Sequence, residues 1–208
     1  MFFQKKEKFN TDSLKSAFLL QKKTLIEKNY PELLNMSQVN FNNALDILWK
    51  SVEQKTKNLE VKIKGNIPLL IVVEKSNWDE KIKKTNGHSD LDFNKISSKK
   101  SQNNFYVILD VEDGKKMIAK SAKDANKKFT KENRCAFNLD ESIALITYYP
   151  KILSDHYFIS ADSFYNKDGQ NQPLLWLLDE NHNPELHYAW FDIAHGSYGA
   201  GSYSIKIQ

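Results

Sequence analysis

Aromatic side chains and histidine gather near the C-terminal end of the sequence, where they could bind a ligand. Trp190 and Asp192 are two residues apart along a predicted strand, so their side chains are expected on the same face. His195 follows in a glycine-containing loop and could fold back on Asp192, giving a histidine–carboxylate pair of the kind that moves protons. The sequence therefore predicts a ligand-binding pocket formed by Trp176, Trp190, Asp192, His195 and Tyr198. The alternative is that the aromatic residues fill a sheet core and His195 is an exposed loop residue.

The spacing of the histidines and of the acidic residues does not predict a metal site. His182 and His187 are five residues apart across a turn, and the sequence has neither the helical pair of histidines nor the paired cysteines of zinc sites. The acidic run from Asp110 reaches Gly114 one position too early for a calcium loop. We expect no metal and no other cofactor.

Nucleophile motifs are equally weak. The segment from Gly196 to Gly199 contains Ser197 but precedes a strand, whereas a nucleophile elbow joins a strand to a helix. Cys135 lies beside Arg134, and without a histidine nearby in the sequence we expect it to be a small buried packing group. No catalytic residue is predicted.

Arg134 is the only arginine among 30 basic residues, and only a guanidinium offers a planar fork for a carboxylate. Asp110 lies in an otherwise apolar predicted strand, where an unpaired charge is costly. We predict that Arg134 forms a structural ion pair with Asp110, or else pairs with the helix-capping residues Asp140 and Glu141. Binding of an anionic ligand by Arg134 is the alternative.

The elements that position these residues indicate an α+β protein, a mainly antiparallel sheet with helices packed on one face. Residues 67–73 and 105–111 read as buried strands, and we expect Glu112 to Gly114 to turn the chain into a short return strand. Ser121 and Asn138 are predicted to cap two helices, the second with Glu141 in a capping box. Beyond residue 153, four short strands separated by turn clusters predict an antiparallel meander.

Two amphipathic helices are predicted before residue 58, one from Thr11 and one from about Ser37. We expect residues 1–58 to form a helical hairpin appendage and residues 59–208 to form the α+β domain. The apolar stripe of such a hairpin must be buried against the domain or against another subunit. The hairpin is therefore a predicted surface for a protein partner or for a homo-oligomer.

Composition points to a soluble chain in the cytoplasm. Cys135 is the only cysteine, which fits a reducing compartment, and no apolar run approaches the roughly 20 residues that cross a bilayer. The first residues do not resemble a secretory signal. Residues 1–150 carry 27 basic and 19 acidic groups, whereas residues 151–208 carry 3 and 7. The lysines are interspersed with acidic residues, which disfavours nucleic-acid binding through lysine-rich faces.

Four stretches together resemble a bacterial family known only as a domain of unknown function: residues 67–73, the spacing from Tyr106 through Asp110 to Gly114, the segment from Leu139 to Pro150, and Trp190 followed by His195 and Gly199. The similarity covers roughly residues 60–208. The family has no assigned activity, so the resemblance implies one domain and no catalytic residue. We expect a non-enzymatic protein- or ligand-binding domain. The alternative is a small-molecule enzyme or ligand-binding protein that uses the C-terminal pocket.

Overall fold

The computed structural model describes residues 6–74, 76–98, 103–178 and 183–208. The first five residues and His182 lie outside the described residues. None of the described helices is both long enough and apolar enough to cross a membrane.

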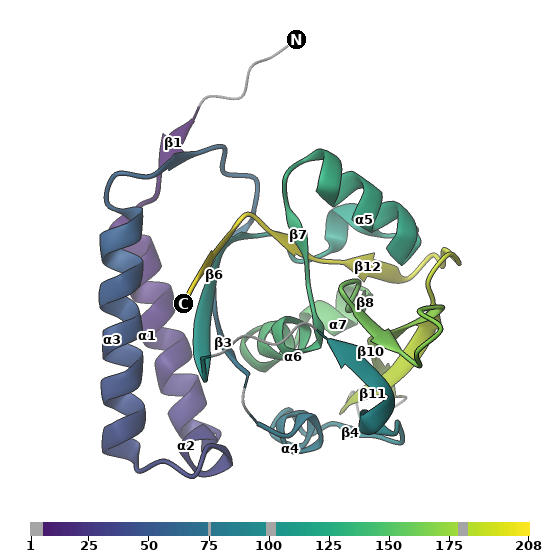
Figure 1. The fold of residues 1–208 in the computed structure, drawn as a ribbon, viewed down its shortest axis with the longest axis horizontal. Helices are drawn as coiled ribbons and strands as arrows, with labels where there is room; N and C mark the ends of the chain where they lie inside the picture. Colours follow the sequence, from purple (N-terminus) through teal and green to yellow (C-terminus); the bar gives the residue numbers. More distant parts are fainter. Residues whose placement is uncertain (1–5, 75, 99–102, 179–182) are drawn as a thin grey trace.

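The N-terminal part is helical, with α1 (Thr11–Glu27), the short α2 (Tyr30–Leu33) and α3 (Gln38–Thr56). Asn10 and Ser37 cap α1 and α3, since the side chain of each accepts a hydrogen bond from a backbone N–H of the first turn. The rings of Phe18 and Trp49 lie 5.3 Å apart, and Lys22 pairs with Asp46 at 2.6 Å. These contacts hold α1 and α3 side by side (Figure 1).

The central sheet has three antiparallel strands in the order β14 (Ile205–Ile207), β6 (Phe105–Val111) and β3 (Ile67–Val73). One face, which includes Leu69 and Leu109, shares a hydrophobic cluster with α1 and α3. The other face, which includes Leu70 and Ile108, shares a cluster with α6 (Leu139–Tyr148). β3 and β6 are almost entirely buried, as their continuous apolar runs predicted.

A second sheet lies beyond α6. Its main path runs through β12 (Tyr198–Ala200), β8 (Tyr157–Ile159), β10 (Asn171–Leu178), β11 (Asn183–Trp190) and β4 (His88–Ser89). The short strands β5 (Ile96–Ser98) and β9 (Ser163–Tyr165) continue it beside β10. Phe158, Leu175 and Leu186 on its inner face pack in the cluster of α6. Ile159 and Leu174 on the outer face pack with α5 (Ala122–Lys131).

The remaining elements are short. They are β1 (Glu7–Lys8), β2 (Glu60–Val61), α4 (Trp78–Lys83), η1 (Phe93–Lys95), η2 (Lys115–Met117), β7 (Cys135–Ala136), α7 (Ile152–Asp155) and β13 (Ser202–Tyr203).

The α+β class is confirmed, and the elements stack in layers: α1 and α3, the central sheet, α6, and the second sheet (Figure 1). Because α1 and α3 share a core with β3 and β6, the N-terminal helices cover a face of the sheet. The division of the chain at residue 58 into an appendage and a domain stays a prediction.

Two expectations about strand connections are wrong. Gly114 has φ +94° as a turn requires, but the chain continues into η2 instead of a return strand. The reason is that β3 and β14 already occupy both edges of β6. The second error concerns the meander, because its last strand, β14, leaves the second sheet and pairs with β6.

Candidate functional site

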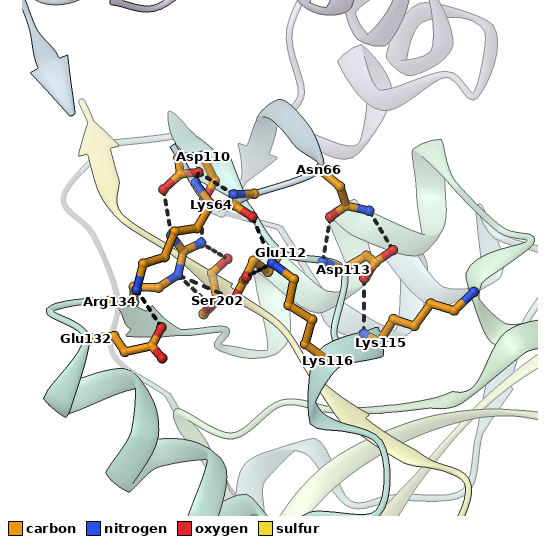
Figure 2. A network of polar contacts seen from close by, with 11 residues as sticks. Lys64, Asn66, Asp110, Glu112, Asp113, Lys115, Lys116, Glu132, Arg134 and Ser202 are labelled. Carbon is orange, nitrogen blue, oxygen red and sulfur yellow. Dashed lines mark hydrogen bonds and ion pairs between the residues drawn. The ribbon is translucent and has the colours of Figure 1, made fainter. Parts of the chain in front are cut away.

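Arg134 and Asp110 form a buried ion pair at the centre of a polar network (Figure 2). Nη1 of Arg134 donates to Oδ2 of Asp110 at 2.5 Å, and Nη2 donates to the Asp110 carbonyl at 2.5 Å. Nε donates to Oγ of Ser202 at 2.8 Å, and Nη2 also contacts the Ser202 carbonyl at 3.1 Å. The guanidinium is thus engaged by β6 and β13 inside the protein, which makes it a structural tie and leaves little of it for an anionic ligand.

Asp110 adopts a left-handed backbone conformation, with φ +56°, near the end of β6. Such a conformation is uncommon outside glycine, although aspartate tolerates it better than most residues. Its Oδ1 accepts hydrogen bonds from the backbone N–H groups of Lys64 at 2.7 Å and Gly65 at 2.5 Å. The carboxylate therefore joins Arg134 on one side to the chain entering β3 on the other.

Two further carboxylates, Glu112 and Asp113, make polar contacts beside this ion pair (Figure 2). Glu112 accepts from Oγ of Ser202 at 3.2 Å and from Nζ of Lys116 at 2.5 Å. Asp113 accepts from Nδ2 of Asn66 at 2.7 Å, and its backbone N–H donates back to Oδ1 of Asn66 at 3.3 Å. These contacts fix the loop after β6 against the turn before β3.

A second buried polar group lies at the start of α6. Asn138 and Glu141 form the predicted capping box, and Glu141 also accepts from the hydroxyl of Tyr106 at 3.0 Å. Burial raises the pKa of Glu141 to about 7, against the lowering effect of the Asn138 N–H. The carboxyl group is therefore poised to titrate near neutral pH.

Asp140, beside Glu141, is paired with a different cation. Nζ of Lys81 donates to Oδ1 of Asp140 and to the Val73 carbonyl at 2.8 Å. The indole of Trp78 donates to the same carboxylate oxygen at 2.8 Å. Lys81 and Asp140 are both buried, so this ion pair ties α4 to α6.

Aromatic rings form a row across the second sheet. Each ring contacts the next, with centroids 4.6 to 6.4 Å apart. In order, the row consists of Tyr165, Tyr188, His187, Trp176, Tyr157, Tyr198 and His195. Adjacent residues of a strand point to opposite faces of the sheet. His187 and Tyr188 are adjacent in β11 and their rings nevertheless stack, so the row of rings passes from one face of the sheet to the other at the edge of β11.

The five residues predicted to form a pocket are only partly brought together. Trp176 and Tyr198 both contact the ring of Tyr157, and His195 contacts Tyr198 with centroids 4.6 Å apart. Trp190 is half exposed, and Asp192 is exposed beyond the end of β11. Both belong to the described residues, and no hydrogen bond or ion pair there joins Asp192 to His195, whose Nδ1 instead accepts from the N–H of Ser197. The pocket stays a prediction.

The outer edge of β11 lacks a partner strand over its last residues in the described part of the chain. β4 pairs with β11 only at Glu185 and Leu186. The backbone carbonyl of Leu186 points away from β10, since it accepts a hydrogen bond from Oγ of Ser89. Backbone groups alternate in direction along an antiparallel strand, so those of Tyr188 and Trp190 also point away from β10. Side chains at this end are unusually exposed: Tyr188 is 37% exposed, Trp190 50% and Ile193 53%. We call these three residues the β11 edge patch.

Four pockets lie elsewhere in the structure, and none of the four includes any of the five predicted residues. One of these pockets, of about 580 Å³, lies between the turn before β3 and the end of α6. A second, of about 500 Å³, lies beside α3 and the start of β6. Neither pocket could be predicted from the sequence, because each combines residues from distant segments.

The described residues contain no group of three or more histidine, cysteine or acidic side chains that could hold a metal ion. Cys135 was expected to be buried, and that expectation is wrong. It is exposed, because β7 has two residues and pairs only with β13 among the described strands.

Four rings of this row were absent from the predicted pocket: Tyr157, Tyr165, His187 and Tyr188. Glu185, which contacts the row, was absent as well. Glu185 accepts from the indole of Trp176 at 2.6 Å, directly across the β10–β11 pair. The alternation of the strands could have placed Glu185 and Trp176 on one face. It could not have indicated that β9 brings Tyr165 against Tyr188.

The layers of helices around the central sheet and the second, seven-stranded sheet define an α+β protein. The chain belongs to a family of unknown function, DUF5701, whose model matches residues 24–207. The resemblance predicted for residues 60–208 is thereby confirmed, and the match begins earlier, within α1. No curated protein and no solved structure matches the chain.

Proposed function

We propose that this protein is a non-enzymatic binding protein that takes an extended, basic segment of a partner protein as an added strand beside β11. The observation that carries the proposal is the outward edge of β11 at Tyr188 and Trp190, exposed and flanked by aromatic rings. Extended peptides commonly bind in this way, with backbone hydrogen bonds to an edge strand and side chains in alternate positions.

The chemistry of the surface favours a basic segment. Aromatic faces attract the cationic groups of lysine and arginine. Glu185 near one end of β11 and Asp192 beyond the other add negative charge, and residues 151–208 carry 7 acidic and 3 basic groups. A peptide that pairs its backbone with Tyr188 and Trp190 can place basic side chains against both rings and carboxylates.

Selection from a library of random 12-residue peptides tests the proposal. The selected peptides are expected to be extended and rich in arginine or lysine, and Trp190→Ala is expected to weaken their binding at least tenfold. Lys15→Ala, at an exposed residue of α1 outside both candidate surfaces, is the control and should leave affinity unchanged. Acidic peptides, or equal binding to the Trp190→Ala variant, would contradict the proposal.

Backbone N-methylation of a selected peptide tests strand addition directly. Only every second residue of an added strand points its N–H toward the edge. Methylation in one register should therefore abolish binding, and methylation in the other should leave it intact. Equal loss in both registers would indicate a different binding mode.

A second candidate surface lies on the N-terminal helices, where the predicted partner or homo-oligomer contact would form. Leu19, Leu20, Val39 and Ile47 are each more than half exposed there. Light scattering at increasing protein concentration tests this surface. A dimer that dissociates in the Ile47→Lys variant would support it, and a monomer at all concentrations would exclude a homo-oligomer.

We also infer a bacterial cytoplasmic location, which the single free and exposed cysteine supports.

A further inference from the structure

The pocket of about 580 Å³ at the end of α6 is separate from the β11 edge patch and is not explained by it. Its walls come from the turn before β3, the loop after β6, and the chain from α6 into α7. Asn66 and Asp113, paired with each other in Figure 2, belong to the first two walls. Tyr148, Tyr149 and the following residues form the third. The volume is in the range of small-molecule sites.

The C-terminal end of α6 borders this pocket through Tyr148 and the residues that follow it. Pro150 has no N–H, so the carbonyl of Ile146 lacks the donor that would continue the helix. Among the described residues, no backbone N–H outside the helix donates to Thr147 or Tyr148 either, because Ile152 bonds to the Tyr149 carbonyl instead. The last turn of α6 contains no basic residue to offset the resulting partial charge.

Side chains add to this polarity. Asp113 and Asp155 both line the pocket, while Ile67, Pro150 and Ile152 supply apolar surface. Two cations oppose these carboxylates: Lys151, which is exposed and also lines the pocket, and the exposed Lys115, whose Nζ lies 3.7 Å from Oδ2 of the exposed Asp155. The Tyr148 ring is held in place, because its hydroxyl donates to the Ile71 carbonyl at 2.8 Å.

We propose that this pocket binds a small organic cation, an amine or guanidinium group carried on an apolar body. The positive group lies toward the Asp113 and Asp155 carboxylates and the carbonyl end of α6. The apolar body packs on the tyrosine rings and on Ile67 and Ile152. An anionic ligand would meet two carboxylates and the negative end of a helix.

Three compounds of similar shape test the charge requirement: phenethylamine, 2-phenylethanol and phenylacetate. Calorimetric titration of the full-length chain should detect phenethylamine, with affinity that falls as salt is added, and should detect neither of the others. Binding of phenylacetate, equal binding of the neutral alcohol, or no binding of phenethylamine at millimolar concentration would each overturn the proposal.

Variants locate the bound cation. Asp155→Asn changes an exposed side chain, so it should fold normally and weaken phenethylamine by about fivefold. Lys151→Ala should strengthen binding, because it removes the opposing charge. Asp168→Asn, at an exposed residue outside the pocket lining, is the matched control. An Asp155→Asn variant that binds like the wild type would contradict the proposed site. The peptide-binding experiments on β11 are unaffected by either result.

Discussion

The Arg134 guanidinium contacts both the side chain and the backbone of Asp110. It donates one hydrogen bond of 2.5 Å to Oδ2 and another of 2.5 Å to the carbonyl oxygen of Asp110. The side chains are 2% and 0% exposed. A buried carboxylate in a left-handed conformation is stable only where its surroundings hold it. Here the Arg134 guanidinium supplies charge, and the N–H groups of Lys64 and Gly65 supply hydrogen bonds on the opposite side.

Arg134→Met is therefore expected to lower the free energy of unfolding by about 3–5 kcal/mol, because it leaves the Asp110 charge buried and unpaired. Urea denaturation followed by circular dichroism measures the change. Lys128→Met, at an exposed residue of α5, is the control and should be nearly neutral. The double variant Asp110→Asn/Arg134→Met should cost less than the sum of the single changes. Additive costs would show that the two residues do not stabilise each other.

Asp110→Asn is expected to be milder than Asp110→Ala. Asparagine retains an oxygen that can accept from Lys64 and Gly65, and it tolerates positive φ. Alanine loses every side-chain contact and retains the strain. The same urea measurements rank the two variants, and equal destabilisation would mean that the contacts to Lys64 and Gly65 contribute nothing.

Glu141 should make stability depend on pH between about 4.5 and 7. Burial raises its pKa in the folded protein to about 7 from a usual value of 4.5, so the folded state holds a proton that the unfolded state releases. Its contribution is present at low pH and is lost as pH rises through this window, by about 3 kcal/mol in all. Urea midpoints at several pH values should show the loss, and Glu141→Gln should remove it.

Titration of His156 changes stability with pH in the opposite direction to titration of Glu141, so the two contributions must be measured separately. Burial lowers the pKa of His156 below 6.5, so its neutral form is favoured in the folded protein, and stability falls as pH drops below about 6.5. The comparison of Glu141→Gln with wild type at each pH cancels this contribution. A slope that is unchanged in Glu141→Gln would show that Glu141 does not titrate in the window.

Gln21 protects the free edge of β3. Its amide donates to the Leu69 carbonyl at 2.9 Å and accepts from the Ile71 N–H at 2.8 Å, replacing a neighbouring strand. Gln21→Met keeps the volume but leaves both buried backbone groups unpaired, which should cost about 2–4 kcal/mol. Leu20→Met, at the neighbouring exposed residue, is the control for urea denaturation. A Gln21→Met variant as stable as wild type would show that another group can replace the amide.

Sequence patterns predicted those features that depend on local periodicity and on unusual residues. The apolar runs of β3 and β6 and the capping box of Asn138 and Glu141 appear where they were expected. The contact of Arg134 with Asp110 could be anticipated because a lone arginine and a buried aspartate each require a partner. All of these rest on physical needs that one residue or one short segment reveals.

Strand partners could not be predicted in the same way. Alternation shows which face a side chain occupies but not which strand lies beside it. Nothing in residues 205–207 indicates that β14 joins β6, and nothing in β11 indicates that its pairing with β4 stops at Leu186. The exposed edge of β11, on which the proposed function rests, therefore became visible only with the topology.

The C-terminal glycines differ in how closely other atoms approach them, and this difference predicts different effects of substitution by alanine. Gly196, Gly199 and Gly201 belong to the glycine-containing loop that the sequence predicts after Asp192. A Cβ added to Gly199 would lie 2.4 Å from Cδ2 of His156 and 2.7 Å from the Gly114 carbonyl, whereas a Cβ added to Gly196 would meet nothing within 4 Å. Gly199→Ala should therefore lower the free energy of unfolding by about 1–3 kcal/mol through overpacking.

Gly196→Ala is the matched control for that change, since the surrounding space is open. It should leave thermal stability unchanged or raise it slightly, because alanine restricts the unfolded chain more than glycine does. Thermal unfolding of the two variants side by side measures the contrast. If both were neutral, the close approach of β12 to His156 would have to relax easily, and Gly199 would not be required for packing. If Gly199→Ala alone is destabilising, this glycine is needed for contact between two backbone segments and not for flexibility.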